Sequence, residues 1–175
     1  MMNTDQEVQE AILRELIEEF EEVNGKVLIG VNSIVENLDE RESIDENEVR
    51  YNLDTLDSEF AIDHSPAAGG NGTIELKHRG ILKYEDLSGE AVIPESHQLE
   101  LLEELDAQKR DQPRNPALSR QELIDETSLT DGELDRAIWF MKEAGQVDAL
   151  TSIGTPWWSN ASIADPGRRI LNRHR

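Results

Sequence analysis

The residues that most often carry catalysis or bind metals are scattered in this sequence. The four histidines have no partner three or four residues away, and the chain has no cysteine, so a zinc site is not expected. The segment AAGGNGT (67–73) is rich in glycine but lacks the Lys-Ser/Thr pair of a phosphate-binding loop. Carboxylates are abundant, yet the sequence indicates no apolar pocket that would shift the pKa values of two of them for general acid–base catalysis. The sequence therefore predicts a protein that is not an enzyme and has no cofactor.

The basic residues of the second half could contact phosphate groups, whose neutralisation normally dominates affinity for nucleic acid. They gather at Lys109, Arg110, Arg114 and Arg120, and again at Arg168, Arg169, Arg173 and Arg175. The alternatives are a solvated linker for the first group and, for the second, a frayed helix end that complements the helix dipole. Residues 1–90 hold 23 acidic and 7 basic residues, and residues 91–175 hold 15 and 10. If DNA is bound, the second half is expected to bind it.

Three tryptophans are candidates for a contact with a protein partner or a second copy of the chain. Trp157 and Trp158 are adjacent, so in a strand they point to opposite faces and only one enters the core easily. The other could be an exposed anchor together with Trp139 or Phe140 on the preceding helix, because rigid aromatics dominate interface energetics. The alternative is a tryptophan folded over the rim of a small core.

Apolar spacing predicts the elements of the first half. Val8, Ile12, Leu16 and Phe20 recur at helical spacing, and Asn24-Gly25 ends this long first helix. An extended run, KVLIG (26–30), precedes a brief helix that Asn32 or Ser33 caps and that runs through Leu38.

The next predicted elements are a helix, a hairpin and a closing helix. Asp45 and Glu48 form a capping-box pair, and the helix that they start runs to about Ser58 with Val49, Leu53 and Leu56 facing inward. FAIDHS (60–65) and TIELKH (73–78) then flank a glycine-rich tip, which predicts a hairpin. RGILKYEDL (79–87) closes the unit as a short helix.

The same order of elements returns in the second half, so we predict two domains, 1–90 and 91–175, of an α+β, mainly helical fold. A helix around Leu99, Leu102 and Leu105 stops before Pro113. Two capping boxes start the next two helices, and Ala144-Gly145 stops the second of them. A hairpin and a helix that begins at ADPGRRIL (164–171) complete the repeat, and the boxes are Ser119 with Glu122 and Thr130 with Glu133.

The composition is strongly acidic, with 38 Asp and Glu against 17 Lys and Arg and a net charge of −21. Lysine is scarce among the basic residues, and this combination resembles proteins of extreme halophiles, especially haloarchaea. Molar salt screens the self-repulsion of such a charge. The alternative is an ordinary acidic protein. The first twenty residues do not resemble a secretion signal, and no apolar run is long enough to cross a membrane, so a cytoplasmic location is expected.

Several strings resemble haloarchaeal winged helix-turn-helix proteins of the arsenic-repressor-like kind. One module has a string that looks like its third helix, VRYNLDTLDSEF (49–60), and a string after the wing that looks like its last helix, HRGILKYEDL (78–87). GELDRAIWFMKEAGQVDAL (132–150) and DPGRRIL (165–171) repeat the pattern. The resemblance implies tandem winged-helix modules, each with three helices and a β-hairpin wing.

The resemblance also implies double-stranded DNA as the partner, with the third helix of each module in the major groove. The residues placed outward are Asn47, Arg50, Tyr51, Asn52 and Thr55 in the first module and Asp131, Asp135, Arg136, Trp139 and Lys142 in the second. Asn52 and Arg50 could read base edges in the first, Arg136 is the expected reader in the second, and Arg120, Arg168 and Arg169 are expected phosphate contacts.

Two observations favour a different function, a protein interaction or scaffold module. The wing segments 65–73 and 151–158 contain no Lys or Arg, and four acidic residues, Glu46, Glu48, Asp54 and Asp57, flank the first candidate reading surface. A solvated helix face is the plain alternative for Arg50. The expected function is a transcriptional regulator of a halophile or its virus, and the interaction module is the alternative.

Overall fold

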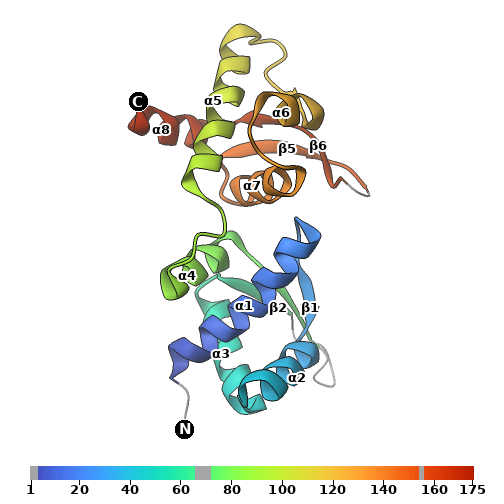
Figure 1. Cartoon of the computed structure of the whole chain (residues 1–175), viewed down its shortest axis with the longest axis vertical. Coiled ribbons are helices and arrows are strands. Elements are labelled where there is room, and N and C mark those ends of the chain that lie inside the picture. Colours follow the sequence, from blue (N-terminus) through green and yellow to red (C-terminus); the bar gives the residue numbers. More distant parts are fainter. Residues whose placement is uncertain (1–3, 66–71, 154–155) are drawn as a thin grey trace. The chain divides into compact units, whose positions relative to one another are not determined.

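A computed structural model describes residues 4–65, 72–153 and 156–175 of the chain (Figure 1). The chain divides into two compact units, Met1–Val92 and Ile93–Arg175, where the sequence predicts a boundary between residues 90 and 91. The described residues form eight helices and two three-stranded antiparallel sheets. The fold is therefore α+β and mainly helical, which confirms the predicted class. None of the described helices is long and apolar enough to cross a membrane.

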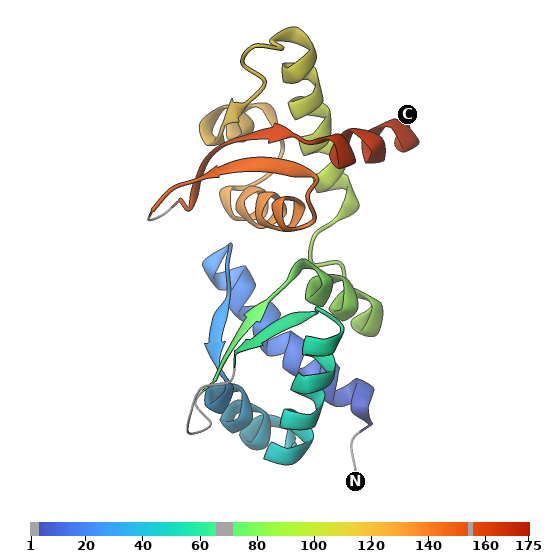
Figure 2. The same ribbon diagram turned by 180° about the vertical axis from the view of Figure 1, so that it is seen from behind.

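Unit 1 consists of four helices around a small sheet. Its strands lie in the order β1-β3-β2, and Figure 2 shows β3 between the other two. Helix α1 packs against α2, α3 and α4. The elements are α1 (Asp5–Val23), β1 (Leu28–Gly30), α2 (Val31–Glu42), α3 (Glu46–Ser58), β2 (Ile62–Ser65), β3 (Thr73–Leu76) and α4 (His78–Ser88).

Local signals explain most of the boundaries in unit 1. The apolar stripe of α1 is buried, and Asn24 ends the helix in the left-handed conformation at φ 53°. The predicted capping box of Asp45 and Glu48 is confirmed at the start of α3. Helix α2 differs from the prediction, because Gly30 precedes it without a side-chain cap and it continues to Glu42.

Unit 2 repeats the order of elements. Its strands lie in the order β4-β6-β5, and both predicted capping boxes, at Ser119 and at Thr130, are confirmed. The elements are α5 (Glu95–Asp111), β4 (Leu118–Ser119), α6 (Arg120–Glu126), α7 (Asp131–Glu143), β5 (Val147–Thr151), β6 (Trp158–Ile163) and α8 (Asp165–His174).

Each unit has a larger sheet than the two-stranded wing of the sequence prediction. The short strand after the first helix adds to the hairpin, since Leu28 lies opposite Glu75 in unit 1 and Leu118 lies opposite Ala161 in unit 2. A fourth helix closes each unit. The tips of both hairpins, residues 66–71 and 154–155, lie outside the described residues.

A close backbone contact recurs at the same place in both units. In the first turn of α4, a Cβ on Gly80 would overlap the carbonyl oxygen of Ala61. In the first turn of α8, a Cβ on Gly167 would overlap the carbonyl oxygen of Gln146. Glycine is therefore required where the last helix of each unit meets the turn before the hairpin.

Candidate nucleic-acid interface

A buried polar network lies at the start of α7, the predicted reading helix of unit 2. Arg120 donates to both carboxylate oxygens of Asp135, over 2.8 Å from Nε and 2.9 Å from Nη2. The indole Nε1 of Trp158 donates to Oδ1 of the same carboxylate over 2.8 Å. Asp135 is only 9% exposed, and its hydrogen bonds raise the pKa of Arg120 above its ordinary value. The three side chains therefore fix α6, α7 and β6 to one another.

This network corrects several predictions about unit 2. Arg120 was predicted to contact phosphate, but its guanidinium is already held by Asp135 and, over 3.2 Å, by Asp131. Asp135 was predicted to face outward, and it is buried because it accepts these bonds. Trp139 follows Asp135 by one turn on the same side of α7 and is 5% exposed, so the prediction of an exposed anchor at Trp139 was wrong.

Arg136, the predicted base reader, is half-buried on α7. Two hydrogen bonds from Thr130 lower the pKa of Glu133, and the nearby side chains of His97 and Arg136 lower it further. The residue also has an interaction within the structure, so it is not a free side chain that waits for a base edge. A base edge would have to compete with these internal partners.

The reading helix predicted for unit 1, α3, offers little to DNA. Asn52 is 1% exposed, accepts from Gln9 Nε2 over 3.0 Å and donates to the Glu48 carbonyl over 3.0 Å. It was predicted to read adenine, and this is wrong because it joins α1 to α3 inside the unit. Arg50 is partly exposed but pairs with Glu46 over 2.7 Å.

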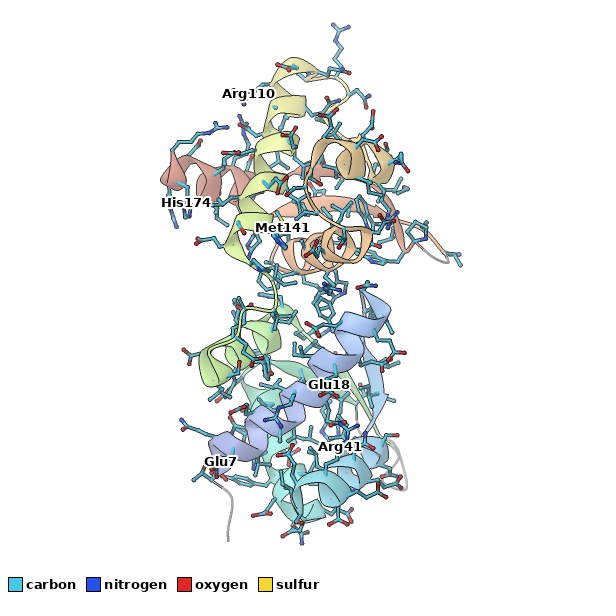
Figure 3. The ribbon with its side chains drawn as sticks, in the orientation of Figure 1. Glu7, Glu18, Arg41, Arg110, Met141 and His174 are labelled. Carbon is cyan, nitrogen blue, oxygen red and sulfur yellow. The ribbon has the colours of Figure 1, made fainter. Side chains whose placement is uncertain are left out.

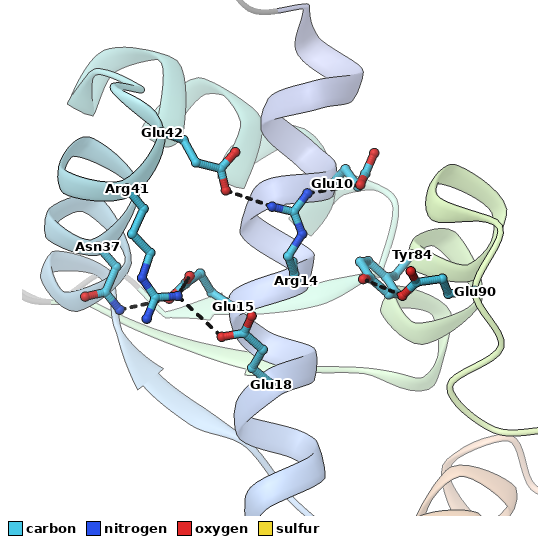
Figure 4. A network of polar contacts seen from close by, with 9 residues as sticks. All are labelled: Glu10, Arg14, Glu15, Glu18, Asn37, Arg41, Glu42, Tyr84 and Glu90. Carbon is cyan, nitrogen blue, oxygen red and sulfur yellow. Dashed lines mark hydrogen bonds and ion pairs between the residues drawn. The ribbon is translucent and has the colours of Figure 1, made fainter.

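Every basic residue of unit 1 has a partner within the unit. Figure 4 shows two of them, Arg14 held by Glu10 and Glu42 and Arg41 held by two further glutamates of α1, Glu15 and Glu18. The remaining pairs are Lys26 with Glu75, Arg50 with Glu46, Lys77 with Glu75 and Asp63, Lys83 with Glu59, and Arg79 over the ring of Phe60. Among the described residues of unit 1, every lysine and arginine therefore already has an acidic or aromatic partner.

Three arginines of unit 2 converge on one buried carboxylate. Asp106 of α5 is 3% exposed. Arg168 Nε lies 3.2 Å from its Oδ1, while Arg110 Nε and Arg175 Nη1 each lie 3.3 Å from its Oδ2. We call these four residues the Asp106 cluster, and Figure 3 labels Arg110 at its α5 end. One negative and three positive charges leave a local surplus of two positive charges, whereas the whole chain is strongly negative.

Three further arginines of unit 2 are exposed and have no partner among the described residues. Arg169 and Arg173 lie on α8, the helix that also carries Arg168 of the Asp106 cluster. Arg114 lies in the loop after α5. The structure thus brings Arg168, predicted as a phosphate contact, together with Arg110 and Arg175. It leaves Arg169, the other predicted contact on α8, available to solvent.

The adjacent tryptophans divide as the sequence predicts. Trp158 is completely buried, whereas Trp157 is half-buried with an indole Nε1 that is shielded from solvent and has no hydrogen-bond partner in the described part of the chain. The exposed apolar residues of this hairpin are Leu150, at 64%, and Ile153. Trp157 therefore remains a candidate for a partner contact.

Sequence reasoning missed the two buried aspartates that organise the basic residues of unit 2. A signal was present for Asp106, which follows Leu102 by four residues and so continues the buried stripe of α5. No comparable signal marked Asp135, whose partners come from α6 and β6. The described residues contain no group of three His, Asp or Glu side chains that could hold a metal ion.

No protein-family model matches the sequence, and no curated protein or solved structure matches it. The function is therefore argued from the fold and from the partners of individual side chains.

Proposed function

We propose that this protein is a DNA-binding regulator built from two winged-helix modules, in which unit 2 contacts the DNA. Both units have the order helix, strand, helix, helix, hairpin, helix, which supports the winged-helix assignment. The acidic composition supports a halophilic cytoplasm as its setting. The observation that carries the proposal is the distribution of basic residues, which all have partners in unit 1, whereas unit 2 has three arginines around the single carboxylate of Asp106 and further exposed arginines beside them.

The proposed phosphate contacts come from α8 and the C-terminal end of α5. Arg169 and Arg173 are exposed without partners, and Arg168 belongs to a cluster with surplus positive charge. These groups can take phosphate oxygens without breaking a one-to-one ion pair, whereas Arg120 would have to leave a buried carboxylate. Arg136 remains the proposed base contact, and it would have to give up its electrostatic interaction with Glu133 to reach a base.

Replacing Arg169 and Arg173 together with Ala is expected to weaken binding to all duplexes alike. Losing two phosphate contacts should reduce the slope of log affinity against log salt by about 2. Arg136→Ala should instead lose about 1 to 3 kcal/mol on a preferred sequence and leave binding to random DNA nearly unchanged. Fluorescence anisotropy of labelled duplexes, at several salt concentrations that keep the protein folded, measures both effects.

Arg50→Ala in unit 1 is the matched control, because this arginine also lies on a predicted reading helix but is paired with Glu46. Its affinity and salt slope should equal those of the wild type. The proposal fails if no duplex binds at the lowest salt compatible with folding, or if the double variant on α8 binds as tightly as the wild type.

A protein interaction module is the second candidate, and the surface of unit 1 favours it. The unit carries a net charge of −16, all its basic residues are engaged, and it exposes Tyr51 and Phe60 by 62% and 68%. Such a surface repels nucleic acid and presents aromatic side chains that suit a protein contact. The two candidates are compatible if each unit serves one of them.

A further inference from the structure

Phe60 occupies a position that a phenylalanine rarely takes. It follows α3 with φ 59°, in the left-handed region, where a side chain without a local hydrogen-bonding group is disfavoured. The residue is also 68% exposed. Both the backbone conformation and the exposure oppose the choice of Phe at this position.

The fold requires the conformation but not the residue. Phe60 N–H donates to the Asp57 carbonyl over 2.9 Å, and Ala61 N–H donates to the Leu56 carbonyl over 3.0 Å. These are the two bonds of a Schellman motif, which ends a helix with a left-handed residue and usually uses glycine there. Ala61 is fixed on its other side as well, since its carbonyl accepts from Lys77 N–H over 3.1 Å.

Unit 2 contains the same turn and uses the expected residue. Gly145 N–H donates to the Lys142 carbonyl over 3.0 Å, and Gln146 N–H donates to the Met141 carbonyl over 2.8 Å. Gly145 has φ 70°. The same left-handed position at the end of a helix is therefore occupied by glycine in unit 2 and by an exposed phenylalanine in unit 1. Backbone strain at a residue type that the turn does not require supports the hypothesis that the side chain has a function.

The surroundings of Phe60 form a small patch of balanced charge. The guanidinium carbon of Arg79 lies 5.7 Å from the centre of the ring, and Lys83 pairs with Glu59, the neighbour of Phe60. Leu82, 48% exposed, and Asp86 share this side of α4. The patch thus holds two basic and two acidic residues around two apolar side chains, in a unit whose net charge is −16.

We propose that this Phe60 patch (Glu59, Phe60, Arg79, Leu82, Lys83 and Asp86) binds the same patch of a second copy of the chain. A two-fold contact places each residue against the matching surface of the partner, so a patch with equal numbers of acidic and basic groups is complementary to itself. Over much of the rest of unit 1, the net charge of −16 would bring like charges together. Phe60 would be the central anchor, with Arg79 of one copy beside the carboxylates of the other. The proposal does not depend on DNA binding.

The test uses Phe60→Gly, because folding and association should then change in opposite directions. Glycine adopts the left-handed conformation without strain, so the unfolding temperature of unit 1, measured at a dilution where the wild type is monomeric, should rise by a few degrees. Self-association in molar KCl, measured by sedimentation equilibrium of the full chain, should weaken by about 30-fold or more, as expected for loss of an aromatic anchor from both copies.

Tyr51→Ala is the matched control, since it removes another exposed aromatic residue of unit 1 from outside the patch, and its association should equal that of the wild type. Arg79→Glu tests the charge balance and should also weaken association. A wild type that stays monomeric at high concentration overturns the proposal and leaves the patch to a different partner. A Phe60→Gly variant that associates like the wild type, or that is only destabilised, also overturns it.

Discussion

Replacing Asp135 with Asn should destabilise unit 2 by about 3 kcal/mol, the lower end of the cost of breaking a buried ion pair. The substitution keeps the shape of the side chain but removes the charge that Arg120 faces, and Arg120 is only 19% exposed in its side chain. The lower end applies because Asp131 still contacts the guanidinium. Denaturant unfolding in molar KCl, followed by tryptophan fluorescence, measures the change in unit 2 alone, because all three tryptophans lie there.

Asp131→Asn is the control for this prediction. It removes the same charge from the same arginine, but the Asp131 side chain is 69% exposed, so the loss should stay below about 1 kcal/mol. Equal effects of the two substitutions would mean that burial of Asp135 does not matter, and the network would then not be what holds α6, α7 and β6 together.

Unit 1 should gain far more stability from salt than unit 2. The net charges of the two units are −16 and −5, and molar KCl reduces the range of their repulsion to about 3 Å. Screening about 2 kcal/mol of repulsion would raise the unfolding temperature of a domain of this size by about 10 °C. We expect a rise of that order or more for unit 1 between dilute buffer and molar KCl, and a smaller one for unit 2.

The residue composition allows both units to be followed in the same sample. Both tyrosines, Tyr51 and Tyr84, lie in unit 1, and the tryptophans lie in unit 2. Fluorine NMR of fluorotyrosine-labelled protein reports the first unit, and tryptophan fluorescence reports the second. Equal salt responses, or a flat response of unit 1, would contradict the assignment of the protein to a high-salt cytoplasm.

Local signals in the sequence were sufficient to predict most of the elements. The capping boxes at Asp45, Ser119 and Thr130 start the helices where the sequence predicts, because the side chain and the backbone groups that it satisfies lie within three residues. The start of α2 was harder to predict, since Gly30 supplies no side-chain signal.

The candidate site was predicted less well, because it depends on contacts between distant residues. Asn52 looked like an outward polar residue of α3, but its partner Gln9 lies 43 residues earlier. Asp135 looked outward for the same reason, and Trp158 and Arg120 reverse that assignment. A helical stripe of three apolar residues leaves the edges of the buried face undefined, so polar residues at those edges are decided by what the rest of the chain brings to them.

The glycine contacts at Gly80 and Gly167 fix the fold without fixing the surface. In each unit a glycine of the last helix lies against a backbone carbonyl of the turn before the hairpin and against a buried leucine side chain, so the specificity of that joint does not reside in any exposed side chain. A scaffold specified in this way leaves its surface free to vary. The two units illustrate this, since one topology carries a net charge of −16 in unit 1 and a local surplus of arginines around Asp106 in unit 2.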